Sequence, residues 1–207
     1  MPPRIHVIRH AQALHNVNQD FSHHDPELTE LGYQQCKAAA KELESLDKIE
    51  LILASPLQRT IQTALALFPA YTESNKRITL LPQLQEVGNT RSDTGNSREY
   101  LENKYGAVLE YSFITPDWTE KGGESPYAPR LAEKRARTTR LLIRDIAQRY
   151  AHRDVNIVVI SHGNYLRLLT QDDAFFKNVE MRTYTFDPVS SEGNLLETTC
   201  SITRRTE

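Results

Sequence analysis

Four short apolar runs constrain the fold of this 207-residue chain more than any other feature of its sequence. They span residues 5–8, 51–54, 78–81 and 155–160, and isoleucine, valine and leucine dominate them. Runs of this length and composition are typical of parallel strands that are covered on both faces of a sheet. We therefore expect four buried strands that come from distant parts of the chain.

Helical patterns lie between these runs. Apolar side chains recur at helical spacing over residues 31–46 and again over about residues 130–150. The clearest stripe follows the second run, and its members are Leu57, Ile61, Ala64, Leu65 and Phe68. Alternating strands and helices predict an α/β fold in which helices cover both faces of the sheet.

Residues 86–129 interrupt this alternation. They hold five of the eight glycines and three of the ten prolines, with one short helical pattern near residues 98–104. A chain of 207 residues fits one domain better than two. We interpret residues 1–207 as a single domain and residues 86–129 as a cap-like excursion that partly covers the site. Its aromatic residues could pack the excursion or form a specificity pocket, and they include Tyr105, Tyr111, Phe113, Trp118 and Tyr127.

Composition argues against several classes of protein. Lysine and arginine total 25 and aspartate and glutamate total 27, so the net charge is −2, whereas nucleic-acid binders usually carry a basic surplus. No run approaches the ~20 apolar residues of a membrane span. Cys36 and Cys200 are too few for a disulfide framework. We expect a cytoplasmic protein, with the nucleus as alternative, that binds neither nucleic acid nor membrane; its oligomeric state stays open.

Charged side chains follow the four apolar runs. Arg9 and His10 follow the first run, Arg59 the second, Glu86 the third and His162 the fourth. Ligands of such α/β folds bind at the carboxyl ends of the strands. We therefore expect these five side chains to meet at one edge of the sheet.

The segment after the second run has features of a helix start. Ser55 is a suitable N-cap, Pro56 fits the first helical position, and Gln58 completes an S-x-x-Q capping box. This interpretation places Arg59 in the first helical turn, next to free backbone N–H groups that favour anions. A guanidinium there matches two oxygens of a phosphate group.

These residue types fit phosphoryl transfer. A neutral His10 could attack phosphorus through its lone pair. Arg9, Arg59 and His162 would hold the phosphoryl oxygens, and Glu86 would protonate the leaving alcohol. Water would then hydrolyse the phosphohistidine. Because cationic side chains neutralise the charge, we expect the reaction to need neither a metal nor another cofactor.

Other chemistries fit the sequence less well. His23, His24 and Asp25 have metal-ligating side chains, but no further ligand cluster stands nearby, so a polar loop is favoured. Neither Cys36 nor Cys200 begins the Cys-x5-Arg pattern of cysteine phosphatases. One predicted helix carries a basic cluster that we interpret as a solvated face, with an anion or partner surface as the alternative: Lys134, Arg135, Arg137, Arg140 and Arg144.

The combined pattern resembles the histidine phosphatase superfamily, the phosphoglycerate-mutase-like proteins. The matching pieces are Arg9-His10-Ala11 with Asn16, residues 28–32, residues 55–64 and residues 161–163. Together they are far more specific than any one of them alone. The resemblance implies a three-layer α/β/α sandwich with a mostly parallel central sheet.

The resemblance also implies roles for individual residues. Those it places in catalysis are Arg9, His10, Arg59, Glu86 and His162. His10 resembles the histidine that is phosphorylated, and Glu86 resembles the proton donor. Asn16 and Gly163 resemble substrate-binding positions of the same pocket.

Two departures from the family pattern bear on the reaction. Ala11 stands where glycine is usual, and residues 87–91 lack the Arg-His-Tyr-Gly that follows this glutamate in true mutases. Residues 93–95 and 180–184 resemble a fungal and plant branch of broad phosphatases, which includes a subunit of the RNA polymerase III transcription machinery.

We therefore expect a metal-independent phosphatase that acts on a small phosphorylated substrate, or binds inorganic phosphate, through a phosphohistidine on His10. One alternative is a phosphoglycerate-type mutase. The other is a weakly active scaffold subunit of a larger assembly, for example one related to transcription.

Overall fold

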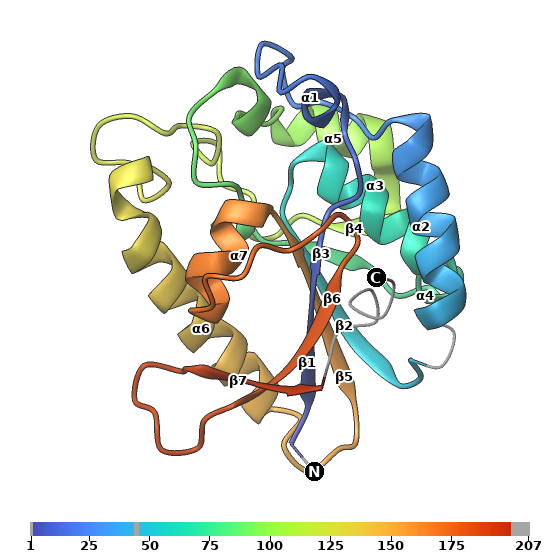
Figure 1. Ribbon diagram of the computed structural model, residues 1–207, viewed down its shortest axis with the longest axis vertical. Coiled ribbons are helices and arrows are strands. Elements are labelled where there is room, and N and C mark those ends of the chain that lie inside the picture. Colours follow the sequence, from blue (N-terminus) through green and yellow to red (C-terminus); the bar gives the residue numbers. More distant parts are fainter. Residues whose placement is uncertain (1, 44–45, 200–207) are drawn as a thin grey trace.

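Strands from distant parts of the chain lie side by side in the middle of the molecule (Figure 1). The computed structural model describes residues 2–43 and 46–199, and within them one sheet has the strand order β4-β3-β2-β5-β1-β6-β7. The strands are β1 (Arg4–Arg9), β2 (Ile49–Ala54), β3 (Ile78–Leu80), β4 (Leu109–Glu110), β5 (Asn156–Ser161), β6 (Met181–Phe186) and β7 (Leu195–Thr199). Cys200 lies outside the described residues.

Helices and short 3-10 turns connect these strands. The helices are α1 (Leu14–Val17), α2 (Glu30–Leu43), α3 (Gln58–Leu67), α4 (Pro69–Glu73), α5 (Arg98–Tyr105), α6 (Ala132–Gln148) and α7 (Gly163–Thr170). The 3-10 turns are η1 (Pro82–Leu84), η2 (Arg91–Asp93), η3 (Gly106–Val108) and η4 (Pro129–Leu131). None of the helices in the described part of the chain is long and apolar enough to cross a membrane.

The predicted strands are confirmed as β1, β2, β3 and β5, and their mutual pairings are parallel. The structure adds β6, which is antiparallel to β1, then β7, which is antiparallel to β6, and the short β4, which is parallel to β3. Arg9 pairs with Ser161 and Ala54 pairs with Ile160 in the register of the sheet. The carboxyl ends of β1, β2 and β5 therefore lie at one edge, where the candidate residues follow them.

Helices cover both faces of the sheet, because alternate residues of a strand face opposite sides. Ile160 of β5 belongs to a buried cluster with Ile61 of α3, whereas Val159 belongs to another with Ile143 of α6 and Leu166 of α7. Figure 1 shows α2 and α3 on one side of the sheet, and α6 and α7 on the other. The expected three-layer α/β/α sandwich is thus confirmed.

The predicted helices are present with somewhat different ends. The pattern over residues 31–46 corresponds to α2, which is described from Glu30 to Leu43, and residues 44–45 of the pattern lie outside the described residues. The pattern from about residue 130 begins with the 3-10 turn η4, and α6 proper begins at Ala132. The short helical pattern in the excursion is α5, which begins with the side-chain hydroxyl of Ser97 as its cap.

The start of α3 differs from its prediction. The helix begins at Gln58, and the side chain of its N-cap residue makes no capping hydrogen bond, so the capping box of Ser55 and Gln58 is wrong. Asp25 replaces it: its Oδ1 accepts a hydrogen bond from the Gln58 backbone N–H at 2.9 Å, and its Oδ2 accepts one from Asn96 at 2.8 Å. A carboxylate is a better partner for a helix N-terminus than a neutral hydroxyl. The Ser55 hydroxyl instead contacts His162, one of the predicted catalytic residues.

Part of the segment 86–129 packs on the side of the sheet that carries α2 and α3, whereas Val87 packs against the cluster that contains residues of α6 and α7. Leu101 and Trp118 belong to the same buried cluster as the residues of those helices. The Trp118 ring lies against Gly95, where a Cβ atom would come within 2.0 Å of it. Tyr111, Trp118 and Tyr127 are buried, whereas Phe113 is exposed. Packing is therefore the role of three of the aromatic residues whose role the sequence left open.

The basic cluster on α6 is only partly solvated. Lys134 and Arg137 are exposed as predicted, but Arg135 and Arg140 are buried. Arg135 donates a hydrogen bond to the Gln85 carbonyl at 3.0 Å, and Arg140 donates one to a carbonyl of α7 at 2.9 Å. The prediction of a wholly solvated face is wrong because buried backbone carbonyls need donors, and these guanidinium groups supply them.

Candidate active site

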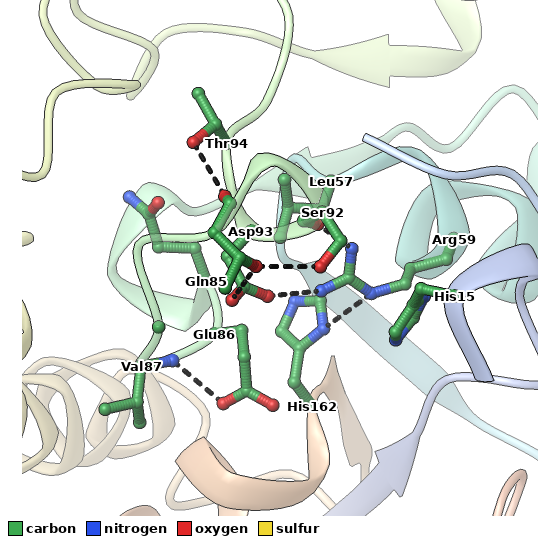
Figure 2. A network of polar contacts seen from close by, with 12 residues as sticks. His15, Leu57, Arg59, Gln85, Glu86, Val87, Ser92, Asp93, Thr94 and His162 are labelled. Carbon is green, nitrogen blue, oxygen red and sulfur yellow. Dashed lines mark hydrogen bonds and ion pairs between the residues drawn. The ribbon is translucent and has the colours of Figure 1, made fainter. Parts of the chain in front are cut away.

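The predicted catalytic side chains converge at the carboxyl edge of the sheet. His10 follows β1 and His162 follows β5, and the centroids of their rings are 5.2 Å apart. Arg59 lies in the first turn of α3, after β2, and Glu86 follows β3 and η1. Figure 2 shows Arg59, Glu86 and His162 close together within one network of polar residues. Arg9, the last residue of β1, completes the group.

His10 has one engaged and one unengaged ring nitrogen. The side chain is 2% exposed, and its Nδ1 donates a hydrogen bond to the Ala11 carbonyl at 2.7 Å. This bond places the ring proton on Nδ1 and the lone pair on Nε2, to which no described residue is hydrogen-bonded. Burial, reinforced by the charges of Arg59 and Arg9, holds the pKa of His10 well below its ordinary value. His10 is therefore neutral near pH 7 and can act as a nucleophile.

Arg59 is buried and held by three neighbours. Its Nε donates to Nδ1 of His162 at 3.2 Å, its Nη1 to the Ser92 carbonyl at 2.6 Å, and its Nη2 to Asp93 at 3.3 Å. Because Nδ1 of His162 accepts, its Nε2 carries the proton and donates to the Ser55 hydroxyl at 2.9 Å. Burial lowers the pKa of His162 well below its ordinary value. Arg59 supplies a fixed positive charge beside a neutral imidazole.

The Arg9 side chain lies against the segment that follows α7. Its Nη1 donates to the Phe176 carbonyl at 2.8 Å, and its guanidinium lies 4.6 Å from the centroid of the Phe175 ring. Gly163 makes this arrangement fit, since a Cβ there would lie 2.8 Å from the Phe175 ring and 3.3 Å from Nε of Arg9. That Nε is buried and has no hydrogen-bond partner among the described residues.

Arg182 holds the segment that positions Arg9. The sequence analysis named it within residues 180–184 of the resemblance but gave it no role in the site. Its buried guanidinium donates to Glu180 at 2.8 Å, to Asp172 at 2.9 Å and to the Phe175 carbonyl at 3.1 Å. These bonds tie β6 to the loop that contains Phe175. The partners lie up to ten residues away across a loop, so no local sequence pattern reveals them.

Glu86 lies at the start of α7. Its Oε1 accepts hydrogen bonds from the backbone N–H groups of Val87 at 2.8 Å and Tyr165 at 3.0 Å, and its Oε2 accepts one from Asn164 at 3.3 Å. Lys121 supports the same segment from the excursion, because its Nζ donates to the Glu86 carbonyl at 3.0 Å. Burial lowers the pKa of Lys121 to about 7. A single lysine in a loop carries no pattern, so sequence analysis missed it.

Asn16 and its neighbour His15 lie on the short helix α1. Asn16 accepts a hydrogen bond from the Ala13 backbone N–H at 3.0 Å through Oδ1, and its Nδ2 contacts Nε2 of His15 at 3.0 Å. The His15 ring is 6% exposed, and its centroid is 5.7 Å from that of His10. Asn16 therefore orients His15, which sequence analysis missed although it directly precedes the predicted Asn16.

Two of the three residues considered as metal ligands have other contacts, and the third, His24, is exposed. His23 is exposed and lies 3.3 Å from Asp20, and Asp25 is the cap of α3. The described residues contain no group of three or more His, Cys, Asp or Glu side chains that could hold a metal ion.

The fold and the site define an α/β protein with a buried neutral histidine between two arginines at the strand ends. The sequence pattern of the histidine phosphatase superfamily (branch 1) matches residues 5–191. The chain therefore belongs to the histidine phosphatase superfamily.

Two relatives show how far the sequence likeness extends. The chain is 39% identical over 90 residues to phosphoglycerate mutase-like protein 1 of Arabidopsis thaliana, a match that covers 37% of this chain and 32% of that protein. It is 31% identical over 105 residues to a probable phosphatase of Schizosaccharomyces pombe, and this match covers 49% of each chain. The chain thus matches less than half of the length of either relative.

Likeness in three dimensions covers nearly the whole chain. The ecdysone phosphate phosphatase of Bombix mori, solved in complex with tungstate, is similar with a TM-score of 0.68 at 14% identity. The match covers 96% of this chain and 92% of that one. At this identity the likeness establishes the shared fold.

Proposed function

We propose that this protein is a metal-independent phosphatase that hydrolyses small phosphate monoesters through a phosphohistidine on His10. The observation that carries the proposal is the state of His10: buried, neutral, with its proton fixed on Nδ1 and its Nε2 lone pair unengaged. Membership of the superfamily and the likeness to a probable phosphatase support the same reaction class.

The charges around His10 suit a phosphoryl group. Arg59 and Arg9 lie close enough to lower the pKa of His10, and they would face the negative oxygens of the transition state. The buried Nε of Arg9 has no partner among the described residues, and a buried donor of this kind calls for an acceptor. A phosphoryl oxygen would provide that acceptor. These two guanidinium groups supply the charge neutralisation that a metal ion gives in other phosphatases.

The reaction has two balanced steps. In the first, Nε2 of His10 forms a bond to phosphorus while the bond from phosphorus to the ester oxygen breaks, and Glu86 gives that oxygen a proton. In the second, the Glu86 carboxylate takes a proton from water, the water oxygen attacks phosphorus, and the bond to His10 breaks. Oε2 of Glu86, which has a single long contact of 3.3 Å, is the oxygen that would carry the proton.

The proposal is tested by hydrolysis of p-nitrophenyl phosphate in EDTA, with wild type beside His10→Ala. We expect turnover by the wild type in the chelator, none by the variant, and an acid-labile, base-stable phosphoenzyme in the wild type alone. Transfer of the phosphoryl group to a second phosphate ester in preference to water would identify a mutase. No phosphoenzyme and no turnover of any ester would contradict the proposal and favour a scaffold subunit.

A further inference from the structure

We infer that His15 is a third histidine of the phosphate site, and that its Nδ1–H group donates a hydrogen bond to an oxygen of the transferred phosphoryl group. The inference rests on the proposed phosphatase function and adds a substrate-binding residue to it. It starts from the hydrogen bonds of Asn16, which fix the orientation of the His15 ring.

The tautomer of His15 follows from those bonds. Oδ1 of Asn16 accepts from the Ala13 backbone N–H at 3.0 Å, so the other atom of the amide, Nδ2, is a donor. This donor contacts Nε2 of His15 at 3.0 Å, which makes Nε2 the acceptor of the neutral ring. The proton of His15 is therefore on Nδ1.

That Nδ1–H group has no acceptor in the described part of the chain. The side chain is 6% exposed, and Nδ1 is buried without a hydrogen-bond partner among the described residues. Buried donors are nearly always paired in folded proteins, and an unpaired one at a site marks the position of a missing partner. Nε of Arg9 is in the same situation. Two unpaired buried donors thus lie near His10: one on Arg9, its neighbour in the chain, and one on His15, whose ring centroid is 5.7 Å from that of His10.

The surroundings of His15 select an anion as the missing partner. Its ring lies 5.7 Å from that of His10, and Figure 2 shows it next to Arg59. The charged groups that act on it most are Arg59 and Arg9, with His23 after them, and together with burial they lower its pKa to about 3. A cation is excluded from such a field, whereas a phosphoryl oxygen is attracted to it and accepts from Nδ1.

The alternative is a purely structural role, in which His15 packs between His10 and Phe21. The ring centroid of Phe21 is 6.1 Å from that of His15. Packing requires the ring, whereas phosphate binding requires a donor at Nδ1. The two roles can be separated by substitution, since an asparagine amide overlaps the Nδ1 position of histidine and a glutamine amide overlaps the Nε2 position.

The experiment compares His15→Asn, His15→Gln and His15→Phe with wild type. The readouts are kcat/KM for p-nitrophenyl phosphate and the inhibition constant of inorganic phosphate, with circular dichroism melting as the folding control. We expect His15→Phe and His15→Gln to weaken phosphate binding and kcat/KM by about 10- to 100-fold, the usual effect of losing one hydrogen bond to a charged group. His15→Asn should keep most of both. His152→Asn and His152→Gln, on an exposed histidine of the turn between α6 and β5, are the matched controls and should equal wild type.

Two outcomes would overturn the inference. If His15→Phe binds phosphate as tightly as wild type, the ring acts by packing alone. If asparagine is no better than glutamine, the donor at Nδ1 has no role. A wild type that binds phosphate through His15 but turns over no ester would contradict the proposed function, and would support only the phosphate-binding part of this inference.

A measurement on the wild type covers the case in which the variants fail to fold. The ¹⁵N resonances of the histidine rings are followed while inorganic phosphate is added. Phosphate should shift the Nδ1 signal of His15 and leave that of the exposed His152 in place. An unchanged His15 signal at saturating phosphate would contradict the inference.

Discussion

Strand β1 carries two buried histidines, His6 in its middle and His10 just past its end, in opposite chemical situations. His6 is 3% exposed and His10 is 2% exposed, and burial is the main reason why both pKa values are lowered. The His6 ring is satisfied at both nitrogens, by Thr183 at 2.9 Å and Asn156 at 3.0 Å. His10 is satisfied at Nδ1 alone.

The difference shows that burial alone does not make a histidine reactive. In the middle of the strand, β5 and β6 flank His6 and supply Asn156 and Thr183. At the strand end the sheet stops, and His10 keeps one hydrogen bond, to the Ala11 carbonyl, while the charges of Arg59 and Arg9 act on its ring. Burial keeps both rings neutral, but only His10 retains a lone pair that a substrate can reach.

The largest expected effect tests this comparison directly. We expect His10→Ala to lower kcat/KM for phosphate esters by at least about 10⁴-fold, because the nucleophile is lost and only binding and electrostatic stabilisation remain. His6→Gln should keep kcat/KM within a factor of about three per folded molecule. Steady-state kinetics gives kcat/KM of each variant relative to wild type. Equal losses in the two variants would mean that His10, like His6, has a structural role.

The sequence predicted the end of β1 better than its middle, and the reason is physical. Apolar runs locate buried strands, and ligand sites lie where such strands end, so Arg9, His10 and His162 could be placed together in advance. The partners of a buried polar side chain come from distant segments that leave no local pattern. The pairing of His6 with Thr183 joins residues 177 positions apart.

The same limit explains what the sequence analysis missed. β6 contains Arg182 and Thr183, for which the sequence analysis predicted no partners; both are buried, and Glu180, Asp172 and His6 pair with them. The capping box at Ser55 is a sound local pattern. A carboxylate that reaches α3 from another loop overrides it.

The second expected effect concerns the charge that distinguishes the His10 region. Arg59→Lys keeps one positive charge but cannot serve His162, Ser92 and Asp93 from three separate nitrogens. We expect kcat to fall by about 10²- to 10³-fold, as on removal of one preorganised donor of a transition state. Arg137→Lys, on the exposed face of α6, is the matched control. Wild-type kcat in Arg59→Lys would show that the fork geometry of Arg59 is dispensable.

The third prediction separates the proton donor from the nucleophile. Glu86→Gln keeps an oxygen that can accept from the backbone N–H groups at the start of α7 but cannot give a proton. We expect alkyl phosphates to react at least about 10²-fold more slowly, the usual contribution of a general acid. p-Nitrophenyl phosphate, whose leaving group needs little protonation, should lose far less. A plot of rate against leaving-group pKa measures the difference, and equal losses for both esters would contradict the assignment of Glu86.

The smallest effect belongs to the satisfied histidine and appears in stability. The pKa of His6 is lowered from 6.5 in the folded chain, so below pH 6.5 the unfolded chain binds a proton that the folded chain does not. His6 therefore costs the wild type up to about 1.4 kcal/mol of unfolding free energy per pH unit as the pH falls.

His6→Gln has no ring that takes up a proton on unfolding, and its amide can still hydrogen-bond with Thr183 or Asn156. We expect the variant to be about 1 kcal/mol less stable than wild type at pH 7, and the gap to narrow as the pH falls toward 5. The titrations of His10, His15, His162 and Asp25 are common to both proteins and cancel in the difference. Urea unfolding at a series of pH values measures the gap, and a gap that stays constant would mean that His6 takes up its proton as readily folded as unfolded.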